Sequence, residues 1–361
     1  MPLILVLIFM LSASVQAQNP DWNAIEKRFE NADKMKDIKA LAYFINNNFD
    51  GDQQQAAALY WWLGKHIRYD VNSALRQRSV SYKSQQQITN EAFSSRKGVC
   101  EGYAGIMDSV FRLLNIPSYI ISGYTRQGQA ISAVPHAWIV AKINGNWRFF
   151  DPTWASGFLN GRRFEAQFNP GFFSLSPEEM RKTHIPYDPI WQFNAEPISH
   201  QEFISNKISA SKSSQNFAYT DSIQAFLSLQ PDQQLAAEYN RIRRDYYPHE
   251  ALKNRMDFLS SNLKIARHNQ QVNMLNMATM QYNEAVLAFN GYLKLQGESP
   301  TGNRKDKQAQ LLKAANELVK SQNLLKQIGD ISADLRGIAN QLQKSVRDLK
   351  KQLEKEGVLF E

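Results

Sequence analysis

A chain of 361 residues is long enough for two ordinary domains. Its hydrophobic content of 43% excludes an intrinsically disordered chain and predicts packed cores. The net charge of +8 is modest for this length and the basic runs, as at 241–244 and 350–351, are short, so we expect no nucleic-acid partner.

The N-terminus carries an apolar run at 3–11, LILVLIFML, followed by small and polar residues. This pattern resembles a secretory signal, with Val15 and Ala17 where a signal peptidase prefers small side chains. No Lys or Arg precedes the run, and it is shorter than an ordinary transmembrane helix. We predict a signal peptide at 1–17, a secreted or periplasmic protein, and no transmembrane anchor after cleavage. The alternative is a buried N-terminal helix.

The following segment predicts helices across 21–63, where apolar residues recur at helical spacing. A polar loop is expected up to Ser95, and a helix at 98–114, ended by Asn115 and Pro117. Runs of alternating or β-branched residues then predict strands at 118–125, 136–143 and 146–151.

The last third has a different composition. A Ser-rich linker is expected at 209–216, between a domain at 18–208 and a helical domain at 217–361. Two nearly Pro-free stretches, 252–295 and 305–353, predict an antiparallel helical hairpin or bundle, completed by a helix near 232–246. Its heptads are too irregular to specify a coiled coil. We expect this region to bind a protein partner or to self-associate.

Cys100 is the only cysteine, so an internal disulfide is excluded. It lies in the block GVCEGYA at 98–104, where a helical pattern begins. A thiol at a helix N-terminus faces unpaired backbone N–H groups and the positive end of the dipole, which favour the nucleophilic thiolate. Cys100 is therefore a candidate nucleophile, and a buried, inert cysteine is the alternative.

A second block places a histidine and a carboxylate on one hairpin. Asn144-Gly145 is a strong two-residue turn signal, so Ile143 is expected to pair with Asn146. Extending that register sets His136 opposite 153 and makes it a diagonal neighbour of Asp151 on the same face. A carboxylate in reach of an imidazole orients the ring and supports its protonated form. The alternatives are a core histidine and an Asp-Pro turn.

No metal or cofactor site is predicted. One Cys with scattered His residues lacks the spacing of zinc ligands. Neither an EF-hand loop nor a glycine-rich phosphate loop is present.

Three blocks, GVCEGYA at 98–104, HAW at 136–138 and DPTW at 151–154, resemble the core of the transglutaminase-like superfamily in order and spacing. The blocks FFSLSP at 172–177, HIP at 184–186 and WQ at 191–192 are similar to its bacterial, kyphoscoliosis-peptidase-like branch. The resemblance covers about residues 21–205.

The resemblance implies an α+β, papain-like fold with helices packed on an antiparallel sheet. It implies Cys100 as nucleophile, His136 as general base and then acid, and Asp151 as the residue that orients His136. A thioester intermediate on a protein or peptide substrate would follow, with hydrolysis favoured over transamidation. Trp61 or Trp62 could offer an indole N–H to an oxyanion, although buried core tryptophans are the simpler interpretation.

A function of another class stays open at this stage. The chain could be a catalytically silent scaffold that keeps the fold and works through its helical C-terminal region, because a fold alone does not establish a function.

Overall fold

The computed structural model describes residues 19–30, 35–76, 83–207 and 217–360. The predicted signal peptide and linker 209–216 lie outside these residues. The chain divides into two compact units, Met1–Gln230 with Ala237–Met256, and Pro231–Ala236 with Asp257–Glu361. Within the described part, no helix combines the length and the apolar character needed to cross a bilayer.

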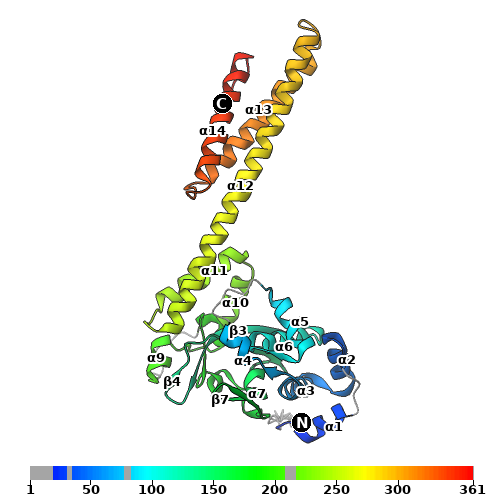
Figure 1. Ribbon diagram of the computed structural model, residues 1–361, viewed down its shortest axis with the longest axis vertical. Helices are drawn as coiled ribbons and strands as arrows, with labels where there is room; N and C mark the ends of the chain where they lie inside the picture. The colour runs from blue at the N-terminus through cyan, green and yellow to red at the C-terminus, as the bar shows by residue number, and fades with distance from the viewer. Residues whose placement is uncertain (1–18, 31–34, 77–82, 208–216, 361) are drawn as a thin grey trace, which may run out of the picture. The chain divides into compact units, whose positions relative to one another are not determined.

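The first unit combines helices with antiparallel strands, as predicted (Figure 1). Its helices, including α11, which belongs to both units, are α1 (Trp22–Glu30), α2 (Ile38–Asn48), α3 (Gly51–His66), α4 (Val71–Arg76), α5 (Gln85–Ser95), α6 (Cys100–Leu113), α7 (Pro152–Ser156), α8 (Pro177–Met180), α9 (His200–Ser205), α10 (Tyr219–Leu227) and α11 (Pro231–Arg244). Two short 3₁₀ helices are η1 (Pro170–Phe172) and η2 (Pro189–Gln192).

The central sheet has the strand order β4-β3-β5-β6, and β9 also pairs with β3. All its pairs are antiparallel. Its strands are β3 (Ser118–Gln127), β4 (Ala130–Ile131), β5 (His136–Ile143), β6 (Asn146–Phe150) and β9 (His184–Pro186). Two small ribbons pair β1 (Arg68–Tyr69) with β2 (Lys97–Gly98), and β7 (Gly157–Asn160) with β8 (Arg163–Ala166).

Strand β5 is buried on both faces. Ala137, Ile139 and Ala141 belong to the core that includes α3 and α6, whereas Trp138 and Val140 pack in a second cluster with Ile223 of α10. The alternation follows from the period of two in a strand. β5 is therefore a rigid support for the side chain of its first residue, His136.

Helix α6 begins at Cys100, two residues after the predicted start, and ends where Asn115 takes a positive φ of 59°. One face of the helix points into the core, since Tyr103, Met107 and Phe111 are fully buried. The helix thus places Cys100 at the edge of the core, with only 8% of its surface exposed.

Two local predictions were wrong. The polar stretch before Ser95 contains helix α5, which begins with a capping box between Ser84 and Gln87. The hairpin register holds from Ile143 to Ile139, but the ladder ends at Phe150. The chain then turns into α7, so residue 153 is helical and does not face His136 across a ladder.

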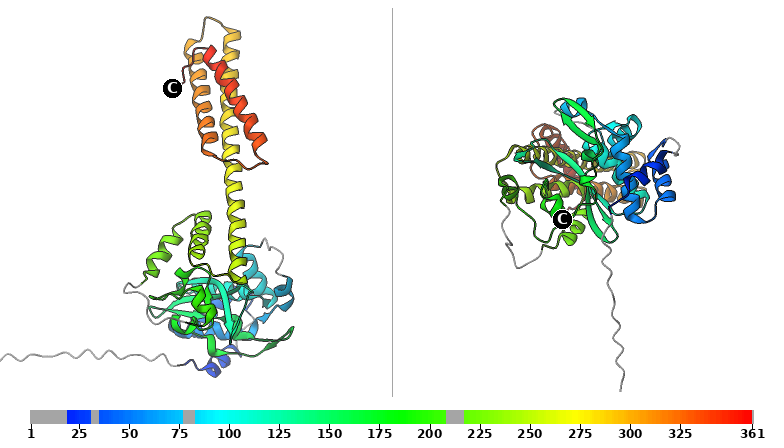
Figure 2. Two further views of the ribbon diagram at one scale, coloured as in Figure 1. Left: turned by 90° about the vertical axis from the view of Figure 1, so that its left-hand side faces the viewer. Right: turned by 90° about the horizontal axis from the view of Figure 1, so that it is seen from below.

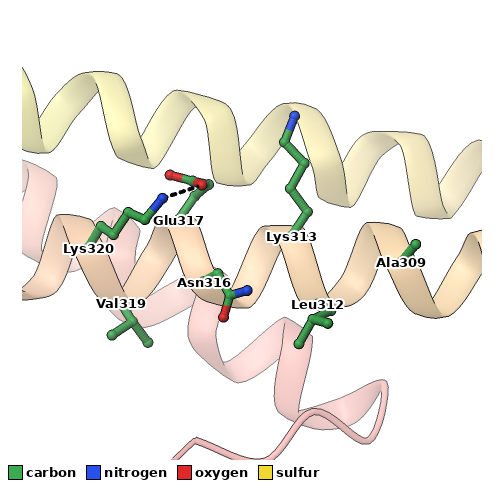
Figure 3. A pocket seen from close by; sticks show the side chains of 7 residues that line it. All are labelled: Ala309, Leu312, Lys313, Asn316, Glu317, Val319 and Lys320. Atoms are coloured by element: carbon green, nitrogen blue, oxygen red, sulfur yellow. Dashed lines mark hydrogen bonds and ion pairs between the residues drawn. The ribbon is translucent and has the colours of Figure 1, made fainter.

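The second unit is a bundle. It contains most of α12 (Glu250–Glu298) and all of α13 (Arg304–Gln327) and α14 (Arg336–Lys355), which lie alongside one another (yellow, orange and red in Figure 2). The second predicted arm is broken at Gly329, which has a φ of 69°. Helix α13 carries the exposed Leu312 and Val319 and, on another side, an ion pair between Lys320 and Glu317 (Figure 3).

Residues beyond the predicted linker belong partly to the first unit. Arg241 of α11 makes two hydrogen bonds, of 2.8 and 2.7 Å, to the carboxylate of Asp188, which is 2% exposed. Asp188 follows β9 by two residues. This buried ion pair and the packing of Ile223 explain why 217–230 and 237–256 group with the sheet rather than with the bundle.

Candidate active site

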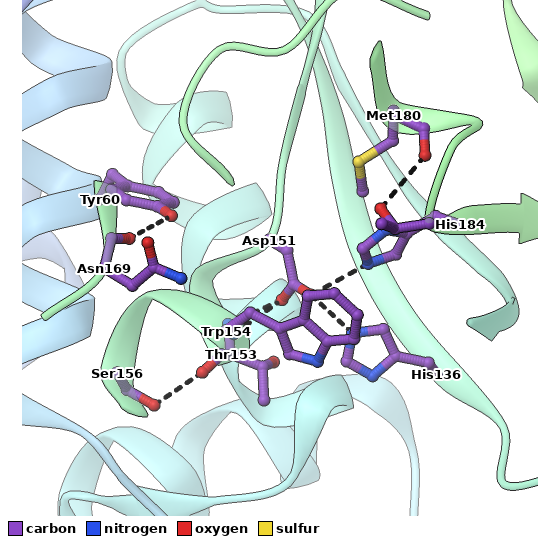
Figure 4. A network of polar contacts seen from close by, with 10 residues as sticks. Tyr60, His136, Asp151, Thr153, Trp154, Ser156, Asn169, Met180 and His184 are labelled. Atoms are coloured by element: carbon purple, nitrogen blue, oxygen red, sulfur yellow. Dashed lines mark hydrogen bonds and ion pairs between the residues drawn. The ribbon is translucent and has the colours of Figure 1, made fainter. Parts of the chain in front are cut away.

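Asp151 is fully buried and accepts four hydrogen bonds. Its Oδ1 caps helix α7 by accepting from the backbone N–H groups of Thr153 at 2.9 Å and Trp154 at 3.1 Å. Its Oδ2 accepts from His136 Nε2 at 2.7 Å and from His184 Nε2 at 3.1 Å (Figure 4). The carboxylate is thus fixed by the helix start on one side and by two imidazoles on the other.

The structure brings His136 and Asp151 together, but not by the cross-strand pairing that the sequence suggested. His136 opens β5, while Asp151 has left β6 and occupies the N-cap of α7. The bond to His136 Nε2 leaves Nδ1 as the ring nitrogen for Cys100. The Cys100 side chain lies near enough to be one of the groups that raise the pKa of His136.

The charges of this cluster are strongly coupled. Burial acts to lower the pKa of His136, but the charge and hydrogen bond of Asp151, together with Cys100, raise it to about 10. Burial alone would raise the pKa of Asp151, yet the charge of His136 and the hydrogen bonds of both histidines hold it well below its usual range. The pair is therefore an imidazolium and a carboxylate at neutral pH.

His184 is the site residue to which the sequence assigned no role. It belongs to the block HIP at 184–186 and lies 33 positions from Asp151 along the chain. Burial lowers its pKa, and the hydrogen bond that it donates to Asp151 does not offset this, so His184 is neutral at pH 7. Its Nε2–H donates to Asp151, and its Nδ1 accepts from the hydroxyl of Thr183 at 2.8 Å.

Glycine at position 123 makes the approach of His184 feasible. Gly123 of β3 pairs with His136 on β5 and with Pro186 on β9. A Cβ atom there would clash with the carbonyl oxygen of Ile185 and with the ring of Trp138. Only a residue without a side chain lets β9 come close enough to bring His184 onto Asp151.

Aromatic rings shield the cluster. The ring of Trp154 lies 4.6 Å from that of His184 and 5.8 Å from that of His136, centroid to centroid (Figure 4). Trp61 and Trp62, in contrast, are buried and stack on Phe29 and Phe93. These two tryptophans are core residues, as the simpler interpretation held.

Tyr69 lies near Cys100. It pairs in register with Gly98, two residues before the cysteine. Burial, together with the charges of Cys100 and Asp151, raises the pKa of Tyr69 to about 12. Its hydroxyl is therefore protonated and able to donate a hydrogen bond.

His136, Asp151 and His184 each offer one metal-ligand atom, and these atoms lie within 4.8 Å of one another. Both imidazole nitrogens, however, direct their protons at the same carboxylate oxygen. We interpret the cluster as a proton-sharing network, because each of the three groups already has a partner of the right kind.

A cavity of about 620 Å³ adjoins the cluster. It lies between the chain segment at 125–136 and the β7–β8 hairpin, and the ring of His136 forms part of its wall. Its volume is in the range of small-ligand pockets.

Known proteins resemble the first unit. Residues 38–152, which include all three predicted site residues, match the transglutaminase-like superfamily. Kyphoscoliosis peptidase of Homo sapiens is 27% identical over 163 residues, 43% of this chain and 24% of that protein. The Mus musculus kyphoscoliosis peptidase is 27% identical over 160 residues, 42% of this chain and 23% of that protein. The chain thus spans about a quarter of the length of these curated relatives.

Among solved structures, the periplasmic domain of TgpA from Pseudomonas aeruginosa is 24% identical, with 32% of this chain and 43% of that chain covered and a TM-score of 0.26. The family match rests on the sequence, and the α+β fold and the His–Asp cluster come from the structure itself. Residues 38–152 therefore form a domain that belongs to the transglutaminase-like superfamily.

Proposed function

We propose that the first unit is a thiol acyl-transfer enzyme that acts on amide bonds of a protein or peptide. Cys100 would be the nucleophile, His136 the base and then the acid, and Asp151 the group that orients His136. The observation that carries the proposal is the hydrogen bond of 2.7 Å between His136 and the buried Asp151, beside a cysteine at the start of a 14-residue helix. Hydrolysis is favoured over transamidation.

The reaction would proceed through a thioester. The Cys100 thiolate attacks the carbonyl carbon, and His136 gives its proton to the leaving amine as the C–N bond breaks. Neutral His136 then takes a proton from water, which attacks the thioester and releases the acid and the thiolate. Asp151 supports the imidazolium in both steps.

Two sources of hydrogen bonds would stabilise the oxyanion. The first turn of α6 presents backbone N–H groups. We propose the Tyr69 hydroxyl as the second donor, since it is protonated and lies near Cys100. Tyr69→Phe should then slow acyl-enzyme formation from an ester about 100-fold, but leave alkylation by iodoacetamide, which forms no oxyanion, unchanged. Equal slowing of both reactions would contradict this role.

Export and the absence of a cofactor also belong to the proposal. The apolar run at 3–11 supports a secreted or periplasmic location. The helical second unit is proposed to bind a protein partner or to self-associate.

The test is the pH dependence of iodoacetamide labelling at Cys100, in the parent protein and in His136→Ala. We expect rapid labelling at pH 6 that is lost in the variant, because His136 would sustain the thiolate. Labelling that rises only near pH about 8.5, as for an ordinary thiol, and is unchanged by the substitution would favour the silent scaffold.

A further inference from the structure

The cavity beside His136 has a wall rich in aromatic and apolar residues. Among the described residues that line it, none is Asp, Glu, Lys or Arg. Its aromatic members are Tyr69, Trp154, Phe158, Phe164 and Phe172. The positive charge of His136, which also lines the cavity, is already paired with Asp151. A wall of this kind therefore favours an uncharged, apolar group and disfavours a charged one, which would lose its hydration.

Exposed apolar side chains gather at the same place. Val134, Phe158 and Leu159 are 64%, 49% and 50% exposed, and all three line the cavity. They come from the segment after β4 and from β7 (both strands are labelled in Figure 1). Large apolar residues left open to water beside a polar cluster are typical of a binding surface.

A buried hydroxyl adds a polar contact. Thr153 is 6% exposed and lines the cavity, and its Oγ1 has no hydrogen-bond partner within the described residues. An unpaired buried hydroxyl is costly, and a substrate amide or carbonyl in the cavity would satisfy it. Thr153 is labelled beside Asp151 and Trp154 in Figure 4.

The position of the cavity indicates which part of the substrate it would hold. His136 forms part of the wall, whereas Cys100 is not one of the described lining residues. In the proposed reaction, the carbonyl side of the substrate becomes attached to Cys100 and the amine side leaves next to His136. The cavity therefore lies on the side of the amine.

We propose, resting on the acyl-transfer function above, that this cavity binds an apolar or aromatic side chain on the amine side of the bond that is cleaved. When an amine instead of water attacks the thioester, the same cavity would bind the side chain of that amine and so select among amines. In that step the amine nitrogen attacks the thioester carbonyl, the C–S bond breaks, and the amine proton passes to His136, which restores the imidazolium–thiolate pair.

Acyl transfer from p-nitrophenyl acetate tests this selection without a known substrate, because the acetyl group has no side chain to recognise. The full chain is acetylated, and amino acid amides then compete with water for the thioester. The measurement is the ratio of N-acetyl amide to acetate for phenylalanine, leucine, aspartate and lysine amides. We expect phenylalanine and leucine amides to be at least about tenfold better acceptors than the charged amides.

Two variants locate the selection in the cavity. Phe158→Glu places a carboxylate at the rim and should reduce transfer to phenylalanine amide while increasing transfer to lysine amide. Leu113→Glu changes a residue of similar exposure, 47%, which does not line the cavity, and should leave the ratio as it is. Labelling by iodoacetamide reports for each protein whether Cys100 is intact.

The outcomes separate the two proposals. A release of p-nitrophenolate that does not require Cys100 overturns both the acyl-transfer function and the inference. A Cys100-dependent release followed by equal transfer to all four amides overturns the inference alone. Selectivity that survives Phe158→Glu unchanged also overturns it, since the selection would then come from elsewhere.

Discussion

The first unit buries histidines around Asp151 and around Tyr124, and the two surroundings differ. His200 Nδ1 lies 2.9 Å from the Tyr124 hydroxyl, and its Nε2 lies 3.0 Å from the carbonyl oxygen of Tyr187. Both ring nitrogens are occupied by neutral groups. Burial lowers the pKa of His200, and the charge of Asp245 does not restore it. His200 is thus an uncharged structural residue.

His136 is largely buried, with 12% of its side chain exposed, but a carboxylate supports its charge and the residue lines a cavity. Burial by itself therefore does not make a histidine reactive. What distinguishes the two surroundings is a partner that stabilises the protonated ring, and access for a substrate. His184 lies between these cases, since it is neutral and satisfied like His200 but is bonded to Asp151.

Removing the charge of Asp151 should make the surroundings of His136 resemble those of His200, where both ring nitrogens are occupied by neutral groups. Asp151→Asn keeps the size of the side chain and its ability to cap α7, but it no longer stabilises the imidazolium. We expect the iodoacetamide labelling rate of Cys100 at pH 6 to fall about 10²–10⁴-fold. The pKa of His136 should fall as well, which NMR titration of the ring would show. A labelling rate within twofold of the parent would contradict the assignment.

A smaller effect is expected at His184. His184→Leu removes one hydrogen bond to the charged carboxylate of Asp151, and such a bond is worth about 1.5–3 kcal/mol. This energy corresponds to a loss in labelling rate of at least roughly tenfold. Since that bond favours the ionised form, its loss raises the pKa of Asp151, and the acid limb of the rate profile should move to higher pH. His184→Gln can still donate an N–H to Asp151. It should therefore restore part of the labelling rate and move the acid limb part of the way back.

His200→Leu is the matched control for His184→Leu. It leaves the Tyr124 hydroxyl and the Tyr187 carbonyl without their partner, which should lower the free energy of unfolding by about 1–3 kcal/mol. The labelling rate of the folded protein and its pH profile should not change. If His184→Leu and His200→Leu have the same labelling rate and the same pH profile, His184 only stabilises the fold, as His200 does.

Sequence patterns predicted those features that depend on neighbouring residues. The Asn144-Gly145 turn fixed the register of β5 and β6, and the apolar spacing of α6 placed Cys100 at its start. The helix α5 was missed because its sequence, QQQITNEAFSS, buries only Thr89, Ala92 and Phe93 and gives a weak periodic signal.

The site was predictable only in part, because some of its contacts join residues that are far apart in the chain. The partners His136 and Asp151 were predicted from the hairpin, although Asp151 reaches His136 from a helix cap. His184 depends on β9, a three-residue strand whose pairing with β3 needs a close approach at Gly123. Nothing in three consecutive residues specifies such a distant partner, so this contact becomes visible only in the folded chain.

The ion pair between Arg241 and Asp188 also determines how the chain could be shortened. A fragment that ends at the Ser-rich stretch near residue 208 would lose Arg241, the partner of the Asp188 carboxylate, which is 2% exposed in the whole chain and lies next to the strand that carries His184. Breaking a buried pair in this way costs about 3–5 kcal/mol, much of the stability of an ordinary domain. A shortened chain that keeps this ion pair therefore extends beyond Arg241, and the first unit itself continues to Met256.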